Sequence, residues 1–305
     1  MVYIGVDLGG TGIKAGVVDE SGKILAKVSC PTGVERGYGP VICDMAALCK
    51  KAVEEAHLTM DDVHSIGIGI PGICDPKTNR VPFCTNLGWH DVPLIEEMHK
   101  YIDKPVHVDN DATVAGLAES VAGVSAGVKN SVFVTLGTGV GGGIILDGAI
   151  AHGSSSMGEI GHIIIEAENG LPCPCGQRGC WEQYASVSAL IKRANEAADA
   201  NPDSILAKIR DEKGGKLDGE AVFDAYGRRC PIAGRVLEKY TDYLAVGITS
   251  LINVFGPDAV ILAGGITSRC DVLVPMLIRK IPNTDVNIEI STLKNDAGSL
   301  GAALL

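Results

Sequence analysis

Two segments that lie far apart in this chain share one glycine-rich hairpin pattern, and this repetition restricts the possible folds more than any other feature. Each copy has an apolar strand that ends in Leu-Gly, an apolar return strand and an acidic turn. The matching residues are Leu8-Gly9, 15–18 and Asp19 in the first copy, and Leu136-Gly137, 143–146 and Asp147 in the second. Two copies of one hairpin predict two related α/β domains in one chain.

The remaining sequence predicts strands and helices of an α/β fold. Apolar runs bounded by turns predict strands over 2–8, 13–18, 23–28, 63–70, 106–108 and 259–263. Apolar residues at helical spacing predict helices over 41–56, 112–122 and 231–255, and a further helix is expected after residue 265. The segment 202–217 is charged and contains glycine, so we expect a surface excursion there.

The charge balance limits the partners of this chain. With 26 Lys and Arg against 37 Asp and Glu, the formal net charge is −11. Nucleic acid and anionic membranes need concentrated positive charge, so we expect neither as a partner. The N-terminus has no basic segment before an apolar run, and no stretch is apolar for long enough to span a bilayer. We therefore expect a cytoplasmic location.

Three glycine-rich turns follow predicted strands and suit the binding of a nucleotide. They are Gly9-Gly10-Thr11-Gly12 (the first glycine turn), Gly137-Thr138-Gly139 (the second) and Gly264-Gly265 (the third). The first two offer backbone N–H groups and a hydroxyl to phosphate oxygens, whereas the third offers bare backbone to an adenosine. Asp7, at the end of the first strand, is placed to hold a hydrated Mg²⁺ ion. One such turn is common in hairpins that bind nothing, but the three together favour a bound nucleotide.

Two common nucleotide-binding motifs are missing from the sequence. It has no P-loop, and it has no G-x-G-x-x-G between a strand and a helix. The segment 137–142 is similar to the second motif in composition, but the apolar residues 144–146 predict a return strand rather than a helix. A dinucleotide-dependent enzyme is therefore disfavoured.

Three of the ten cysteines lie within eight residues, and a histidine precedes them. These residues are Cys173, Cys175 and Cys180, with His162 eleven positions before the first cysteine. One imidazole and three thiolates complete a tetrahedral zinc site, which is typical of structural rather than catalytic zinc. The alternative is three reduced core cysteines, but the glycines and prolines of the loop favour a metal site. We therefore predict a structural Zn²⁺ ion bound by these four side chains.

The motifs together resemble the ROK family of sugar kinases and repressors. The similar segments are Asp7-Leu8-Gly9-Gly10-Thr11, 136–142, Ala263-Gly264-Gly265 and the cysteine loop, which matches CxCGxxGCxE up to Glu182. The likeness extends from Tyr3 to Ala303, and it implies the actin-like (ribonuclease H-like) ATPase fold of actin, hexokinase and Hsp70. That fold has two related α/β domains with a cleft between them.

The resemblance also suggests domain boundaries. We expect an N-terminal domain over 1–117, completed by 291–305, and a C-terminal domain over 118–290 with the zinc loop at 162–182. One departure from the family is Gly12, which stands where lysine or asparagine is common. Lys14 could then approach the phosphates, but we expect it to face solvent on its strand.

Asp111 is the candidate catalytic base. It follows Asp109-Asn110 after a predicted strand and opens a predicted helix. Position alone favours an N-cap for Asp111, whereas the resemblance implies the base that accepts the proton of the sugar hydroxyl. The resemblance assigns sugar binding to Gly72, Asn86, Asn110, Asp111, Glu159, His162 and Glu182. It assigns ATP and Mg²⁺ to Asp7, Gly9, Gly10, Thr11, Gly12, Gly137, Thr138, Gly139, Gly264 and Gly265.

The implied activity is phosphoryl transfer from MgATP to a hexose, with glucose as the first expectation and glucose 6-phosphate as the product. N-acetylmannosamine, allose and fructose kinases of the family share these residues and stay as alternatives. A non-catalytic sugar sensor or repressor is a more distant alternative. The first nucleotide-binding strand starts at about Tyr3, which leaves no room for an N-terminal DNA-binding domain, and Asp7 and Asp111 are both present. Relatives imply a homodimer or homotetramer.

Overall fold

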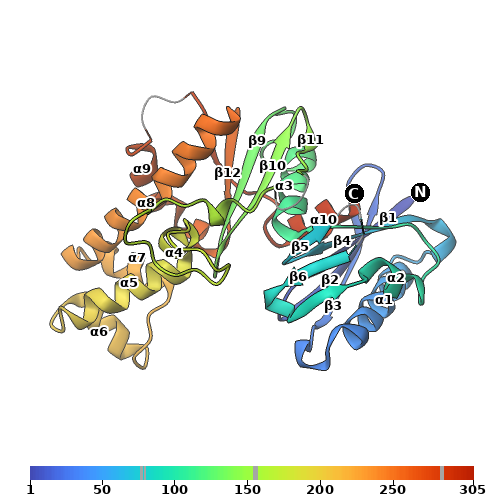
Figure 1. Ribbon diagram of the computed structural model, residues 1–305, viewed down its shortest axis with the longest axis horizontal. Coiled ribbons are helices and arrows are strands. Elements are labelled where there is room, and N and C mark those ends of the chain that lie inside the picture. The colour runs from blue at the N-terminus through green and yellow to red at the C-terminus, as the bar shows by residue number, and fades with distance from the viewer. Residues whose placement is uncertain (76–77, 79, 154–156, 282–284) are drawn as a thin grey trace. The chain divides into compact units, whose positions relative to one another are not determined.

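The computed structural model describes residues 1–75, 78, 80–153, 157–281 and 285–305, and the chain divides into two compact units (Figure 1). Unit 1 consists of Met1–Phe133, Gly143–Gly158 and Ser291–Leu305. Unit 2 consists of Val134–Gly142 and Glu159–Ile290. The domain boundaries that the sequence suggests stay a prediction.

The two five-stranded sheets have the same strand order, as the repeated hairpin predicts. The first has the order β3-β2-β1-β4-β8, and the second β11-β10-β9-β12-β13. When each set is numbered along the chain, both sheets read 3-2-1-4-5. The bounds of the first set are Val2–Leu8 (β1), Gly12–Asp19 (β2), Ile24–Pro31 (β3), Val63–Ile70 (β4) and Val106–Asn110 (β8). Those of the second are Ser131–Leu136 (β9), Val140–Leu146 (β10), Ala149–Ile150 (β11), Ala259–Ala263 (β12) and Asn287–Ile290 (β13).

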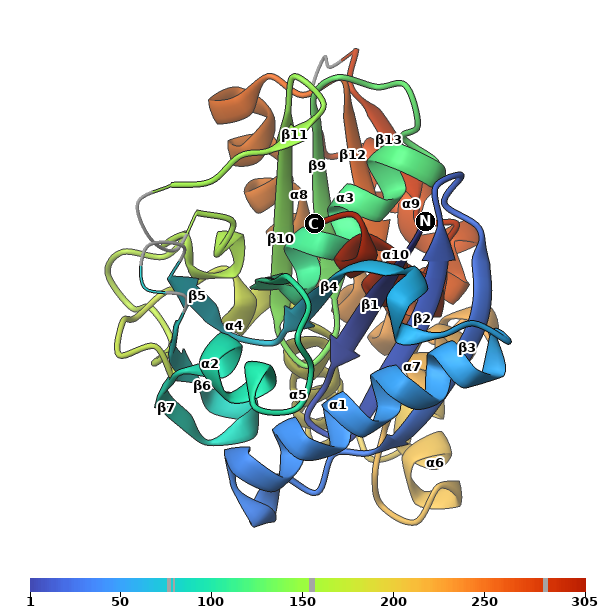
Figure 2. The ribbon, with the colours of Figure 1, turned by 90° about the vertical axis from the view of Figure 1, so that its right-hand side faces the viewer.

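Helices cover both faces of the first sheet. Helix α1 (Tyr38–Glu55) contacts β2 and β3 on one face (Figure 2), while α3 (Asp111–Ala122) and α10 (Ala297–Ala303) contact β4 on the other. Side chains alternate along a strand, so Ile4 and Val6 enter the core under α1 while Gly5 faces α10. A Cβ on Gly5 would lie 1.7 Å from the carbonyl oxygen of Ser299, and only glycine permits this approach of α10 to the sheet.

A small three-stranded sheet also belongs to unit 1, and the sequence did not predict it. Its strands are β5 (Ile73–Asp75), β6 (Arg80–Cys84) and β7 (Trp89–Val92), in that order. Helix α2 (Leu94–His99) follows β7. The guanidinium of Arg80 lies 2.5 Å from the carboxylate of Asp91 and so joins β6 to β7. The 3₁₀ turn Thr85–Leu87 between these strands contains Asn86.

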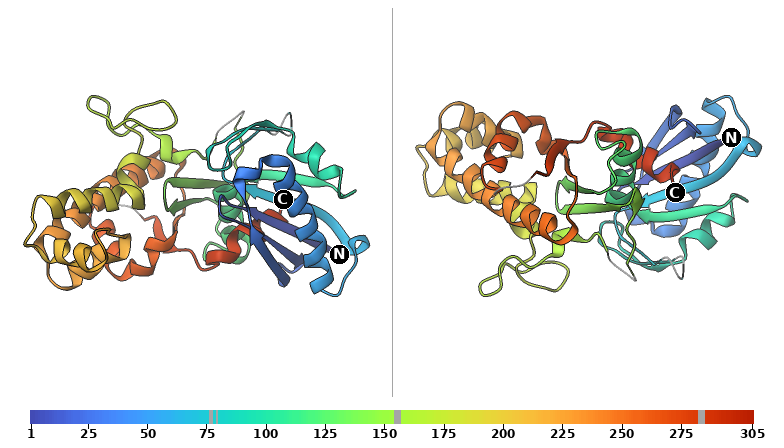
Figure 3. Two further views of the ribbon diagram at one scale, coloured as in Figure 1. Left: turned by 90° about the horizontal axis from the view of Figure 1, so that it is seen from below. Right: turned by 90° about the horizontal axis from the view of Figure 1, so that it is seen from above.

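Unit 2 contains six α-helices within the described residues, drawn in yellow to orange-red in Figure 3. Helix α8 (Pro231–Phe255) contacts α4 (Glu182–Ala185), α5 (Val187–Asp199), α7 (Gly219–Gly227) and α9 (Cys270–Ile278). It starts with proline at its first position and ends at Gly256, whose φ of 53° is left-handed.

The segment 202–217, expected as a surface excursion, is largely exposed but also contains a packed helix. Helix α6 (Ile205–Glu212) lies in this segment, and it contacts α5 and α7. The side chain of Ser204 caps its N-terminus by accepting a hydrogen bond from the N–H of Ala207. Because Leu206 and Ala207 are fully buried, the charged residues of this segment form only the outer face of a packed helix.

A fully buried carboxylate joins α3 to the C-terminal segment of unit 1. Glu119 on α3 accepts hydrogen bonds from the hydroxyl of Ser291 at 2.6 Å and from the N–H of Leu293 at 2.9 Å. Its second oxygen accepts from the N–H of Val124 at 2.9 Å. A buried charge is tolerated when several donors surround it, so this carboxylate secures the segment that leads into α10.

Within the described part of the chain, no helix is both long enough and apolar enough to cross a membrane.

Candidate active site and metal centre

The Asn110-Asp111 pair lies where β8 ends and α3 begins. Asn110 is the N-cap of α3, because its side-chain oxygen accepts hydrogen bonds from the N–H groups of Ala112 (2.9 Å) and Thr113 (3.2 Å). Asp111 is the first residue of the helix, so the reading of Asp111 as the N-cap is wrong. The N-terminus of the helix favours an ionised carboxylate at this position, and the capping function is already fulfilled by Asn110.

Gly72 and Asn86, two further residues predicted to bind sugar, each lie beside another predicted site residue of unit 1. The side-chain amide of Asn110 donates to the carbonyl oxygen of Gly72 at 3.3 Å. A Cβ on Gly10, in the first glycine turn, would lie 3.4 Å from the carbonyl oxygen of Asn86. Burial raises the pKa of the nearby Cys84 thiol to about 11, and the charge of Asp111 adds to this effect. Within unit 1, the residues predicted for the sugar and for the phosphates are therefore neighbours.

The first glycine turn is closed by backbone hydrogen bonds and by a threonine. The N–H of Gly9 donates to the carbonyl of Gly12 at 2.9 Å, and the hydroxyl of Thr32 donates to the carbonyl of Gly9 at 2.6 Å. Asp7 precedes this turn, and its carboxylate lies 3.1 Å from the ammonium of Lys14. Lys14 is half-exposed, but it pairs with Asp7 rather than pointing only to solvent. The predicted Mg²⁺ ligand thus has a cationic partner across the β1–β2 hairpin.

A histidine that the sequence did not single out contacts the segment that precedes Asp111. The ring Nε2 of His152 lies 2.6 Å from one carboxylate oxygen of Asp109. The other oxygen of Asp109 accepts from the N–H of Asn110 at 2.7 Å. These two contacts fix Asp109 next to the Asn110-Asp111 pair. No local sequence signal indicates them, because the two side chains are 43 positions apart.

In unit 2, the second and third glycine turns border one cavity of about 360 Å³. Gly137, Thr138 and Gly265 line it, together with residues that the sequence analysis missed. Its apolar wall consists of Leu136, Val187, Ile191, Phe223 and Ile266. Its polar lining consists of Ser188, Glu220, Ser268 and Arg269, with Gly219. A mostly apolar cavity with a few polar groups beside glycine turns suits a nucleoside.

Gly264 is required by the backbone rather than by the cavity. Its φ is 100°, and a Cβ at this position would lie 2.0 Å from the carbonyl oxygen of Leu136. Gly265 has open space around it and lines the cavity directly. The two glycines of the third turn therefore have different functions, one in permitting the turn and one in leaving room beside it.

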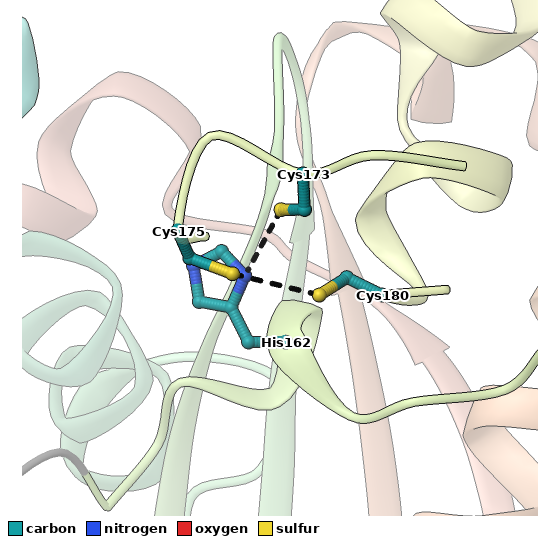
Figure 4. A group of neighbouring side chains, drawn as sticks. All are labelled: His162, Cys173, Cys175 and Cys180. Atoms are coloured by element: carbon teal, nitrogen blue, oxygen red, sulfur yellow. Dashed lines mark hydrogen bonds between the residues drawn. The ribbon is translucent and has the colours of Figure 1, made fainter. Parts of the chain in front are cut away.

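His162, Cys173, Cys175 and Cys180, the Cys/His cluster, form a site that can hold a metal ion (Figure 4). Their ligand atoms all lie within 4.8 Å of one another. The Nδ1 of His162 is 3.6 Å from the Sγ of Cys173, and the Sγ atoms of Cys175 and Cys180 are also 3.6 Å apart. Tetrahedral bonds of about 2.3 Å to sulfur and 2.0 Å to nitrogen place ligand atoms about 3.5–3.8 Å apart. The two 3.6 Å distances therefore fit pairs of ligands on one four-coordinate metal.

The two glutamates near the Cys/His cluster have different partners. The carboxylate of Glu159 lies 3.8 Å from the Nε2 of His162, the ring nitrogen that is not directed at Cys173. Burial raises the pKa of Glu159, and the charge of Glu182 adds to this, while His162 lowers it. The carboxylate of Glu182 instead accepts a hydrogen bond from the N–H of Val140 at 3.1 Å. Val140 is the residue that follows the second glycine turn.

The predicted site residues are thus divided between the units. Those in unit 1 are Asp7, Gly9, Gly10, Thr11, Gly12, Gly72, Asn86, Asn110 and Asp111. Those in unit 2 are Gly137, Thr138, Gly139, Glu159, His162, Cys173, Cys175, Cys180, Glu182, Gly264 and Gly265. Their functions stay predictions.

The duplicated sheet and the glycine turns at its strand ends are the features of an actin-like ATPase fold. The model of the ROK family matches residues 3–305, and the chain belongs to that family. The expected fold class is confirmed, because solved ROK kinases have the same fold.

Relatives within the family include enzymes and regulators. A glucokinase from Halalkalibacterium halodurans is 36% identical over 311 residues, which cover 99% of this chain and 94% of that protein. The solved structure of a ROK family glucokinase from Streptomyces griseus, in complex with glucose and AMPPNP, has a TM-score of 0.82 at 32% identity, with 99% and 98% of the two chains covered. A xylose repressor from Caldicellulosiruptor bescii is 26% identical, and the match covers 98% of this chain but 76% of the repressor.

Proposed function

We propose that this protein is an ATP-dependent hexose kinase that phosphorylates glucose to glucose 6-phosphate. The observation on which the proposal rests is the full-length similarity to glucokinases, one of which is a ROK family structure in complex with glucose and AMPPNP. Two observations support the proposal: Asp111 is the first residue of α3, and the second and third glycine turns border one cavity of about 360 Å³.

Unit 1 supplies the base and part of the sugar site. Asp111 accepts the proton of the attacking sugar hydroxyl, while Asn110, Gly72 and Asn86 hold the sugar. An ionised Asp111 suits this task, because the N-terminus of α3 stabilises a carboxylate that is ready to accept a proton. Glu159, His162 and Glu182 of unit 2 bind further sugar hydroxyls.

The phosphates of ATP are bound by the first and second glycine turns, and Mg²⁺ by Asp7. Phosphoryl transfer needs positioning and charge neutralisation more than covalent chemistry, so backbone N–H groups, the metal and the base are sufficient parts. Lys14 neutralises Asp7 when Mg²⁺ is not bound, and MgATP replaces this ion pair. The adenosine occupies the cavity beside Gly265.

The metal of the Cys/His cluster is zinc, and its function is structural. The donor set has three sulfurs and one imidazole, which zinc favours over the hard cations, and four protein ligands leave no open position for a substrate. The metal fixes the loop on which Glu182 follows Cys180 by two residues.

A coupled assay of ADP release tests the activity and its substrate together. We expect glucose to have the highest kcat/KM among glucose, N-acetylmannosamine, allose and fructose, with no ADP release in the absence of Mg²⁺. A higher kcat/KM for one of the other sugars would replace glucose as the substrate. No turnover with any sugar, together with sugar binding in calorimetry, would favour the non-catalytic sensor.

A further inference from the structure

The residue that follows the second glycine turn, Val140, is held from two sides. Its N–H donates to the Oε2 of Glu182 at 3.1 Å. Its carbonyl oxygen lies against Gly161, where a Cβ would come within 2.2 Å of that oxygen. Both peptide groups of Val140 thus have close, specific neighbours in unit 2.

Both neighbours of Val140 lie within two residues of a ligand of the Cys/His cluster. Gly161 immediately precedes His162, and Glu182 follows Cys180 by two residues. Trp181 lies between Cys180 and Glu182, and its indole N–H donates to the carbonyl of Tyr243 on α8 at 2.7 Å. The segment 180–182 is therefore also joined to α8.

The other end of the second glycine turn contacts the same segment of the chain. The N–H of Val187, at the start of α5, donates to the carbonyl of Gly137 at 2.9 Å. The last residue of the turn lies close to the same glutamate, because a Cβ on Gly139 would lie 2.1 Å from the Oε2 of Glu182. The backbone between Gly137 and Val140 therefore contacts Val187 at one end and Glu182 at the other.

We propose that Glu182 and Gly161 are positioning residues through which the metal of the Cys/His cluster fixes the second glycine turn. The metal would then determine nucleotide affinity as well as sugar binding. The physical reason is that a tetrahedral metal fixes the backbone of its ligands, and outer contacts transmit that order to groups that do not touch the metal. This inference rests on the proposed function, in which the second glycine turn binds phosphate.

The two contacts can be changed separately from the metal ligands. Gly161→Ala introduces a methyl group against the carbonyl of Val140, while Gly227→Ala makes the same change in unit 2 at a position with open space. Glu182→Ala removes the acceptor of the Val140 N–H, while Glu182→Gln keeps an acceptor of the same size. Zinc content and AMPPNP binding without sugar are measured for each variant, by elemental analysis and by calorimetry.

We expect Gly161→Ala and Glu182→Ala to bind AMPPNP about tenfold more weakly than the unmodified protein. Their zinc content should stay near about one ion per chain, because all four ligands are present. Gly227→Ala and Glu182→Gln should stay within about threefold of the unmodified protein, although Glu182→Gln also loses sugar affinity. Removal of the metal with a chelator should weaken AMPPNP binding at least as much as Gly161→Ala.

The outcomes separate this inference from the proposed function. If the unmodified protein does not bind AMPPNP, the proposed kinase itself is wrong. If it binds AMPPNP, and Gly161→Ala and Glu182→Ala bind it equally well, Glu182 is only a sugar ligand and the inference is overturned. Where Gly161→Ala does not fold, the comparison of Glu182→Ala with Glu182→Gln decides alone.

Discussion

Replacing Asp111 with asparagine separates catalysis from stability, because the helix cap is Asn110 whereas the proposed base is Asp111. The helix cap is Asn110, whose side chain accepts from Ala112 and Thr113. Asp111 itself accepts from the N–H of Ala112 at 2.8 Å through one oxygen, and an asparagine side-chain oxygen can do the same. The substitution therefore removes a charge and a proton acceptor but keeps the local hydrogen bonding.

We expect Asp111→Asn to have a small effect on stability and a large effect on catalysis. Loss of a negative charge at the N-terminus of α3 should lower the free energy of unfolding by about 0.3–1 kcal/mol. Loss of a positioned general base should lower kcat by about 10²–10⁴-fold, which corresponds to about 3–5 kcal/mol in the activation barrier. Sugar affinity should change little, since the asparagine still hydrogen-bonds a hydroxyl.

The assay is kcat on glucose by coupled ADP release, with unfolding in urea measured in parallel. Asp62→Asn is a control for loss of a carboxylate at a helical turn, because Asp62 ends the 3₁₀ turn Met60–Asp62 of unit 1, accepts a hydrogen bond from the N–H of Thr59 and belongs to no predicted site. A kcat within about threefold of the unmodified enzyme would contradict the assignment of the base, since even weak general-base catalysis exceeds that factor. Glu159 would then be the first carboxylate to test.

Three further predictions follow from single contacts. Gly264→Ala should lower the free energy of unfolding by about 2 kcal/mol or more, because φ is 100° there and the new Cβ would lie 2.0 Å from a carbonyl oxygen. Gly265→Ala should leave the urea midpoint unchanged, and equal midpoints for the two variants would contradict this account of the turn. Glu119→Leu should lower the free energy of unfolding in urea by about 3 kcal/mol or more, because it leaves buried donors without an acceptor, and Glu119→Gln should lower it less. An unchanged stability of Glu119→Leu would show that the carboxylate is dispensable. Elemental analysis should show that Cys175→Ser has lost most of its zinc. Cys43→Ser, which changes an exposed cysteine on α1, should keep about one ion per chain. Zinc retained in Cys175→Ser would exclude Cys175 as a ligand.

The features that the sequence predicted well are local in the chain. The hairpins at Leu8-Gly9 and Leu136-Gly137 were predictable because a strand, a glycine turn and a return strand follow one another within about twenty residues. The Cys/His cluster was predictable for the same reason, since three ligands lie between Cys173 and Cys180. The position of Asp111 at the start of α3 also follows from a strand that ends next to a capping asparagine.

The missed features depend on contacts between distant parts of the chain or on very short elements. Strand β5 has three residues and β7 has four, which is too short for an alternation pattern to be recognised. Glu119 looks like an ordinary polar residue of a helix, because its donors at 291–293 lie more than 170 positions away. The contact of Glu182 with Val140 spans 42 positions, so the sequence could indicate a sugar ligand but not the backbone group that this carboxylate holds.

The place of α10 within unit 1 has a consequence for biosynthesis. Unit 1 begins with the first strand but needs residues 291–305, which the ribosome makes only after residues 159–290 of unit 2. Until then, Gly5 and Gly67 face an empty position where Ser299 and Ala302 will pack, and Glu119 lacks its donors at 291–293. The nascent N-terminal sheet is therefore incompletely covered while the residues of unit 2 are being made. Although unit 1 is translated first, we therefore expect its folding, rather than that of unit 2, to depend on chaperones and on the C-terminal residues.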